Sequence, residues 1–154
     1  MVYLPYSFLL LAEEIPPDSK LVTSKQLTGG QFCYVSIERA KANIKRVFGR
    51  RPASKMFLNS AKILGGSKGD LGHGDYSVKI NALPLIPITI ILYEEDSEFP
   101  PDAQIFFNKS VSHYLDLEQT GILVELTVER LKEAYKVISE KKESLLWFLK
   151  INYY

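Results

Sequence analysis

The stretch LGGSKGDLGHGDYSVKINALPLIPITI, residues 64–90, decides the fold of this chain. After its glycines, residues 76–81 alternate apolar with polar side chains, the period of two that indicates a strand with one solvated face. Residues 88–93 are apolar almost throughout and rich in β-branched side chains, which predicts a central strand covered on both faces. We expect Pro84 and Pro87 in the connection between these strands, because proline cannot donate a ladder hydrogen bond.

The glycines at the start of this stretch are predicted to stop a helix and then to turn the chain into the first strand. They do not form a P-loop, which ends in Gly-Lys-Ser/Thr, or a dinucleotide-binding fingerprint, which follows a strand and opens a helix. Asp70, His73 and Asp75 offer one nitrogen and two oxygens, but a glycine loop with no fourth ligand is usually solvated. We therefore expect no metal site here.

On the carboxyl side of the stretch, residues 94–102 form an acidic loop and residues 103–107 a third strand. Asp116 then begins the longest helix, with Gln119 three residues on as its capping-box partner. One side of this helix carries a stripe at steps of three and four: Leu117, Gly121, Val124, Val128, Leu131, Tyr135 and Ile138. A coiled coil uses the same spacing, but a mixture of Gly, Val and Tyr is more typical of a helix that lies across a sheet.

On the amino side of the stretch, three helices are predicted. The first covers residues 5–14, which are rich in Leu, Ala and Glu, and two prolines stop it. The second is capped by Ser36 and ends at Gly49, with an apolar face made of Ile37, Ala40, Ile44, Val47 and Phe48. The third follows Pro52 and ends at the glycines 65 and 66, and its buried side is expected to hold Met56, Phe57, Ile63 and Leu64.

Together these elements predict an α+β fold. A small antiparallel sheet of three or more strands packs one face against the long C-terminal helix, and the additional N-terminal helices close another side. With 154 residues the chain suits a single domain, residues 1–154, which can bury about two thirds of its unfolded surface.

The composition argues against several function classes. The net charge is +1 at pH 7, with 19 Lys and Arg among 18 Asp and Glu, so no field attracts nucleic acid or an anionic membrane. Cys33 is the only cysteine, which excludes an internal disulfide, an iron–sulfur cluster held by this chain alone and an all-cysteine zinc site. The apolar run at residues 8–12 is too short to span a membrane and lacks the basic residues that precede a signal-peptide core. We therefore expect a cytoplasmic protein with no membrane or nucleic-acid partner.

Three side chains are candidates for binding a ligand. Asp75 ends the glycine loop, Glu95 belongs to the acidic loop, and His113 stands just ahead of the N-terminus of the long helix. Acidic loops are usually solvated, but two carboxylates beside a sheet edge can serve acid–base chemistry where burial separates their pKa values. His113 either packs and caps the helix or acts as a general base or cofactor ligand.

Two functions stay open at this point. In the first, the chain is a non-catalytic binding or accessory module that arranges Gly74 and Asp75, the loop at 94–101 and His113 around one cleft for a small cofactor or a partner protein. In the alternative, it is a small enzyme in which His113 and either Asp75 or Glu95 act as acid and base. We favour the first, because enzymes bring perturbed groups together in a pocket and the sequence spacing shows no such set.

The C-terminal segment ESLLWFLKINYY, residues 143–154, is mostly apolar or aromatic. It follows a polar run at residues 139–144, where the helix is expected to bend or end. Left in water, such a segment is an aggregation hazard. Either it packs on its own domain, or Trp147, Phe148 and Tyr153 contact a second copy or another protein, since aromatic anchors are typical of binding hot spots. If the partner is a second copy, the tail mediates homo-oligomerisation.

Several short motifs occur in a characteristic order along the chain. LTGGQFCY at residues 27–34 precedes LGG at 64–66, and HGDYSVKINALPLIPITIILYEEDSEFPPDAQIFF, SHYLDLE and LVELTVERL follow. In this order they resemble an uncharacterised prokaryotic domain family, catalogued as a domain of unknown function and common in anaerobic bacteria and archaea. The resemblance implies a prokaryotic cytoplasmic domain, a companion to anaerobic redox or one-carbon cofactor chemistry. It implies no established activity and no site residue for this chain.

Overall fold

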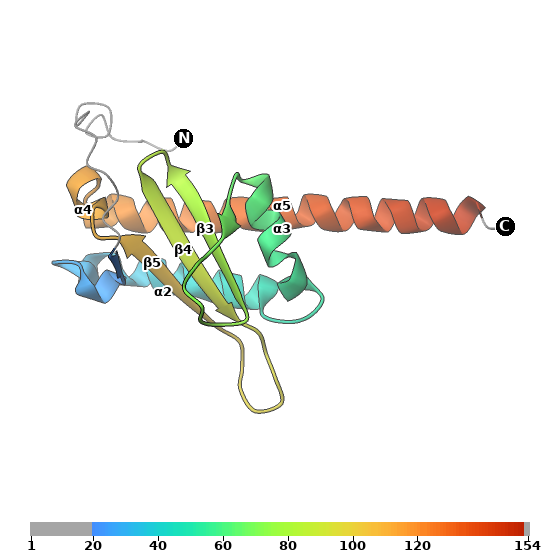
Figure 1. Ribbon diagram of the computed structural model, residues 1–154, viewed down its shortest axis with the longest axis horizontal. Helices are drawn as coiled ribbons and strands as arrows, with labels where there is room; N and C mark the ends of the chain where they lie inside the picture. Colours follow the sequence, from blue (N-terminus) through green and yellow to red (C-terminus); the bar gives the residue numbers. More distant parts are fainter. Residues whose placement is uncertain (1–19, 153–154) are drawn as a thin grey trace.

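The computed structural model describes residues 20–152, and the helix predicted over residues 5–14 lies outside this part of the chain. The fold is built around a five-stranded antiparallel sheet with the strand order β1-β5-β4-β3-β2 (Figure 1). The strands are β1 Leu21–Val22, β2 Ser67–Lys68, β3 Tyr76–Leu83, β4 Ile86–Tyr93 and β5 Asp102–Asn108. The sheet, with helices packed against it, confirms the predicted α+β class.

The central strand is β4, as the sequence predicted. Its residues 86–92 are all buried, with β3 paired along one edge and β5 along the other. In the ladder, Ile90 lies between Val78 of β3 and Ile105 of β5. The predicted alternation in β3 is confirmed, since Val78 and Ile80 are buried while the polar residues beside them are partly or fully exposed. The wet side of β3 is therefore the side that faces away from the helices.

The two prolines of the β3–β4 hairpin lie in different structural elements. Pro84 lies in the turn between the strands, which confirms its prediction. The prediction for Pro87 is wrong, because Pro87 is part of β4 and lies opposite Asn81. The register of the ladder shifts between Asn81 and Leu83, and an irregularity of this kind tolerates a residue that has no N–H to donate.

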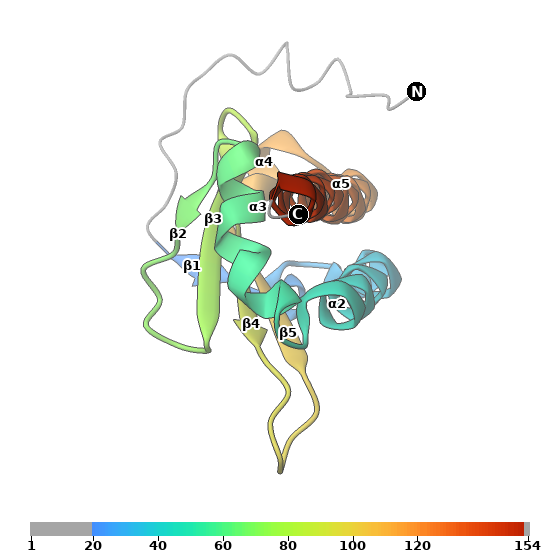
Figure 2. The same ribbon diagram turned by 90° about the vertical axis from the view of Figure 1, so that its right-hand side faces the viewer.

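The described part of the chain has four α-helices: α2 Tyr34–Phe48, α3 Phe57–Ile63, α4 Val111–Tyr114 and α5 Leu117–Asn152. Figure 2 shows α2, α3 and α5 together on one face of the sheet. The prediction that the earlier helices close another side is therefore wrong. All three pack on this face because the inward side chains of β3, β4 and β5, among them Val78, Ile90 and Phe107, form one continuous apolar surface.

Helix α2 begins two residues before Ser36, the predicted cap. A 3-10 turn, Gly30–Phe32, leads directly into it, and the N–H of Ile37 already donates to the carbonyl of Cys33 at 3.0 Å. The helix ends at Gly49, as predicted. Its apolar face is also confirmed, with Ile37, Ala40, Ile44 and Phe48 buried.

Helix α3 follows a 3-10 turn, Ala53–Met56, that forms the first part of the helix predicted after Pro52. The ring of Phe57 is fully buried, and its centroid lies 5.0 Å from that of Phe48. The prediction that Ile63 is buried is wrong, because α3 turns Phe57, Ser60 and Ala61 inward and leaves Ile63 54% exposed. The glycines end the helix as predicted, with the N–H of Gly66 donating to the carbonyl of Ala61 at 2.8 Å.

The predicted capping box at the start of α5 is confirmed. The N–H of Gln119 donates to Oδ1 of Asp116 at 2.8 Å, and the N–H of Asp116 donates to Oε1 of Gln119 at 3.0 Å. Val124, Val128 and Leu131 of the predicted stripe are buried against α2, α3 and the sheet. The first half of α5 is therefore part of the core.

The second half of α5 leaves the domain, as Figure 1 shows. The predicted bend or end at residues 139–144 is wrong, since α5 is one continuous helix to Asn152. Every residue from 140 to 151 is exposed, so the first alternative for the tail, packing on its own domain, is also wrong. Within residues 20–152, no helix is long and apolar enough to cross a membrane, α5 included.

Candidate functional site

The glycine loop is fastened to the end of β4 by Asp75. The N–H of Asp75 donates to the carbonyl of Leu92 at 3.0 Å, and its Oδ2 accepts the N–H of Glu94 at 2.9 Å. Gly74 has a φ of +74°, and a Cβ at this position would lie 2.3 Å from Cγ2 of Ile91. The position therefore requires glycine, both for its left-handed backbone and for its close approach to the strand.

Glu94 is the most enclosed carboxylate of the acidic loop, with its side chain 13% exposed. Arg51 donates to its Oε1 from Nε at 3.0 Å and from Nη2 at 2.7 Å, and Ser54 donates to its Oε2 at 2.7 Å. Hydrogen bonds from Arg51 first, and then from Ser54, hold the pKa of Glu94 below its ordinary value of 4.5. The same pair raises the pKa of Arg51. Glu94 is therefore an anchored anion rather than a carboxyl group poised to exchange a proton.

Glu95, the predicted candidate, is paired in a similar way. Arg50 donates from Nη2 to Oε1 of Glu95 at 3.2 Å, and the backbone N–H of Glu95 donates to the carbonyl of Gly49 at 2.7 Å. Arg50 and Arg51, which hold the acidic loop from the connection between α2 and α3, were not among the residues predicted from the sequence. The only available signal was two adjacent arginines before a proline, about forty residues away from a run of carboxylates.

A shallow pocket of about 650 Å³ lies beside these contacts. Carboxylates, an aromatic pair and two prolines line it, with one lysine and one glutamine: Lys45, Asp75, Tyr93, Glu94, Asp96, Phe99, Pro100, Pro101, Asp102 and Gln104. Several of these carboxylates are already engaged. Asp96 accepts the N–H groups of Glu98 and Phe99, and Asp102 lies 3.9 Å from Nζ of Lys45. The pocket brings together Asp75 and the start of the acidic loop, two of the elements that the sequence predicted to meet.

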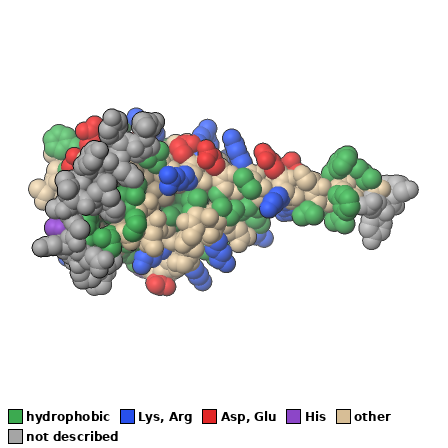
Figure 3. Space-filling model, turned by 90° about the horizontal axis from the view of Figure 1, so that it is seen from above, with side chains coloured by type: hydrophobic (Ala, Val, Ile, Leu, Met, Phe, Trp, Pro, Cys, Tyr) green, Lys and Arg blue, Asp and Glu red, His purple; other side chains and the backbone are tan. Residues whose placement is uncertain are grey.

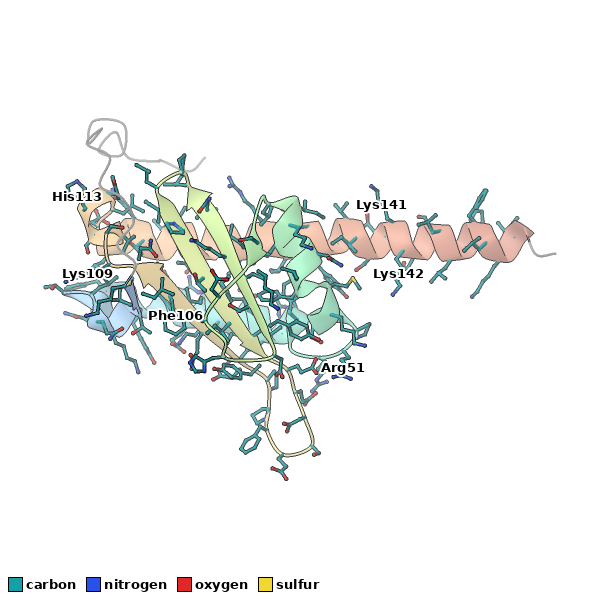
Figure 4. All side chains as sticks on the ribbon, in the orientation of Figure 1. Arg51, Phe106, Lys109, His113, Lys141 and Lys142 are labelled. Atoms are coloured by element: carbon teal, nitrogen blue, oxygen red, sulfur yellow. The ribbon has the colours of Figure 1, made fainter. Side chains whose placement is uncertain are left out.

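His113 lies elsewhere. Asp75 is bonded at the carboxyl end of β4, whereas His113 is on α4, which follows the carboxyl end of the antiparallel strand β5. The two positions are therefore at opposite ends of the sheet, about 23 Å apart along a strand of this length. Figure 4 likewise shows His113 at the end of the domain opposite Arg51, the partner of Glu94. The shared cleft is not formed, and His113 cannot work as an acid or base together with Asp75 or Glu95.

Among the described residues, His113 and Cys33 do not form a further reactive centre. His113 is exposed, and its ring stands edge-on to Tyr114 with centroids 5.1 Å apart. Cys33 is buried, its S–H donates to the carbonyl of Gly30 at 3.3 Å, and burial raises the pKa of its thiol. Across residues 20–152, no three His, Cys, Asp or Glu side chains lie close enough together to hold a metal ion.

The projecting half of α5 carries a cluster of exposed apolar side chains. Its exposed side chains, which we call the apolar tip, are Leu145, Leu146, Trp147, Phe148, Leu149 and Ile151. Each of the six exposes at least half of its surface, and Trp147 exposes 67%. Figure 3 shows apolar side chains gathered near the far end of the projecting helix, beyond the charged side chains of its middle part. Of the predicted contact residues, Trp147 and Phe148 belong to this tip, and Tyr153 lies outside the described residues.

A family model described as "Domain of unknown function (DUF3786)" matches residues 3–130. This match includes the sheet and α5 as far as residue 130, and it stops before Leu131 and the apolar tip. No curated protein and no solved structure matches the chain significantly.

Proposed function

Since the chain belongs to the family Domain of unknown function (DUF3786), whose description assigns no activity, we propose a function from the geometry. The protein is a non-catalytic binding module that docks a partner protein through the apolar tip of α5. We also propose that it works in the cytoplasm, because its lone cysteine, Cys33, suits a reducing compartment.

The observation that carries this proposal is the exposure of the apolar tip. Soluble proteins expose single apolar side chains without consequence, but a contiguous apolar patch usually marks an interaction site. Here six apolar side chains lie within seven residues of one helix, all of them in solvent. Trp147 and Phe148 add the aromatic side chains that anchor protein–protein contacts.

The arrangement of the titratable groups supports a non-catalytic role. Glu94 and Glu95 are tied to Arg51 and Arg50, and His113 is at the other end of the sheet. General acid–base chemistry needs two such groups within reach of one substrate, with pKa values suited to proton transfer. The charged cluster serves instead to fix the acidic loop to the connection between α2 and α3.

The pocket beside Asp75 supports a second candidate function, the binding of a small cofactor that the sequence also left open. Its volume of about 650 Å³ lies within the usual range of ligand sites, and its carboxylates with Tyr93 and Phe99 suit a cationic organic molecule. Intact-mass measurement under native conditions on the protein as purified tests this candidate. A bound small molecule that Tyr93→Ala or Phe99→Ala releases supports it, and a protein that carries nothing in any preparation contradicts it.

Removing the apolar tip tests the docking proposal. A chain that ends after Lys142 lacks the six tip residues but keeps the described core, so we expect it to melt like the full chain. The truncated chain must also lose its association with the partner. Light scattering measures self-association, and stoichiometric recovery of one protein from the source cells measures binding to a different partner. A truncated chain that unfolds would return the tip to the core, and one that associates like the full chain would also refute the proposal.

A further inference from the structure

One face of α5 can be followed from the buried half of the helix into the projecting half. Inside the domain, Val124 and Leu131 are buried on this face. Steps of three and four residues from Leu131 lead through the half-buried Tyr135 and Ile138 to Lys142, Leu145 and Leu149. We call Ile138, Lys142, Leu145 and Leu149 the seam. The seam residues follow the heptad spacing of a coiled coil. Residues 140–151 of this helix are all exposed, so beyond residue 139 the seam is no longer covered by the domain.

We propose that the partner docked by the apolar tip is a second copy of this chain, whose projecting helix lies antiparallel on the seam. This inference rests on the proposed function and names its partner. With the pair centred on residue 147, Leu145 of each copy packs against Leu149 of the other. Leu146 and Phe148 flank these contacts on the two sides of the seam, so four of the six tip side chains are covered. The arrangement is an isologous twofold contact, the commonest symmetry of homodimers.

The charges on the projecting helix select the antiparallel orientation. In a parallel pair, Lys142 would face its own copy in the middle of the seam, and like charges in direct apposition are destabilising. In the antiparallel pair, Lys142 lies beside the last turn of the other α5, which ends at Asn152. The final carbonyl groups of a helix lack intrahelical partners and carry a partial negative charge, so they attract ammonium groups. Figure 4 shows Lys142 near the base of the projecting half, on a different side of the helix from Lys141.

The outer side of the projecting helix provides a matched control. Nine residues along an α-helix correspond to about two and a half turns, so Lys136 lies on the side opposite Leu145. Lys136 is exposed and lies outside the apolar tip. Lys136→Glu changes the net charge by the same amount as Leu145→Glu and Leu149→Glu together. The two variants therefore differ in which side of the helix receives the negative charge.

The size of the contact sets the expected strength. The seam offers a few side chains on each copy, compared with about 20–30 residues on each side of a standard interface. We therefore expect a dimer that forms and dissociates with concentration rather than a permanent one. Sedimentation velocity over a wide concentration range measures this directly on the full chain.

A double variant and a control variant decide whether the seam makes the contact. Leu145→Glu with Leu149→Glu is expected to abolish the dimer, whereas Lys136→Glu is expected to leave at least half of the parent association constant. Equal loss in both variants would overturn the proposal, because the loss would then follow from the added negative charge and not from the seam. A full chain that stays monomeric at every concentration would also overturn it. That result would leave the docking proposal intact if truncation after Lys142 still releases a different, stoichiometric partner.

Cysteine cross-linking tests the orientation. Mixing the Leu145→Cys chain with the Leu149→Cys chain is expected to give a disulfide-linked pair, because these positions are opposite each other in the antiparallel arrangement. Either variant alone is expected to cross-link poorly, since its two copies are displaced by four residues, about 6 Å along the axis, beyond disulfide reach. Efficient cross-linking of Leu145→Cys with itself would indicate a parallel pair and refute the orientation. The native Cys33 is buried and does not interfere.

Discussion

Replacing one aromatic side chain in the core and one in the apolar tip compares how much each region contributes to stability. Phe48→Ala removes a ring that is fully buried where α2, α3 and α5 meet. Its centroid lies 5.0 Å from that of Phe57 and 5.4 Å from that of Tyr135 on α5. Trp147→Ala removes a larger ring that is 67% exposed. We expect the loss of the smaller, buried ring to lower the free energy of unfolding far more than the loss of the larger, exposed one.

The magnitude follows from the packing. Truncating a buried phenylalanine to alanine costs about 3–5 kcal/mol, as lost transfer free energy plus the cavity that remains. The two ring pairs of Phe48, each contributing about 0.5–1.5 kcal/mol, place it in the upper half of this range. For a domain of this size, each kcal/mol lowers Tm by about 2–4 °C, so Phe48→Ala should lower it by roughly 8–20 °C. Trp147→Ala is a surface substitution, and it should change the free energy of unfolding by no more than about 0.5 kcal/mol.

Thermal and urea unfolding followed by circular dichroism at 222 nm measures both variants. The protein concentration must be low, because any association through the tip would add to the apparent stability of the parent. A Trp147→Ala chain that loses as much stability as the Phe48→Ala chain would refute the reasoning. It would show that the tip packs on its own domain, and the docking proposal would fall with it.

Three further substitutions probe the core, the charged cluster and the glycine loop. Val128→Asp places an unpaired charge at a fully buried position of α5 and should cost several kcal/mol of unfolding free energy, whereas a variant that melts like the parent would refute the packing of α5 on the domain. Because the pKa of Glu94 is lowered in the folded state, its contribution to stability is present above the ordinary value of 4.5 and lost as the pH falls through the folded-state pKa. The Tm difference between the parent and Glu94→Gln should therefore shrink as the solution is acidified, and a difference independent of pH would contradict this. Gly74→Ala should lower Tm more than Gly72→Ala, because both have a positive φ but only the first new Cβ meets a strand, at Ile91; equal losses would mean that backbone strain alone decides.

Local patterns predicted the parts of the fold that depend on neighbouring residues. The alternation at Val78 and Ile80 identified β3, and the capping box at Asp116 and Gln119 located the start of α5 within one residue. Such signals act over a few residues, so one sequence contains them completely. Pro87 was misjudged because the ladder irregularity that accommodates it is a property of the β3–β4 pair rather than of either strand.

The candidate site depended on contacts that no local pattern encodes. Asp75 and the acidic loop meet because β3 and β4 pair in one register, which fixes the glycine loop beside residue 94. His113 was grouped with them by residue type, although antiparallel pairing of β5 carries it to the other end of the sheet. The arginine partners of the acidic loop were missed for the same reason, since 43 residues separate Arg51 from Glu94. For the tail, the apolar composition identified the right segment. Its exposure could not be predicted, because it depends on the direction in which α5 leaves the domain.

The continuity of α5 has a consequence for how its far end remains ordered. An isolated peptide of about a dozen residues is seldom helical in water, because forming the first turn fixes several dihedral angles for a single hydrogen bond. The projecting half avoids this nucleation step, since the turns at Val128 and Leu131 are already held by the core and each further residue only extends them. A partner therefore meets a helix whose backbone is largely ordered before contact, and less conformational entropy is lost on binding than with an unstructured tail. A partner that binds the tip therefore also fixes the direction of the domain, because the tip and the half of α5 that packs in the core belong to one uninterrupted helix.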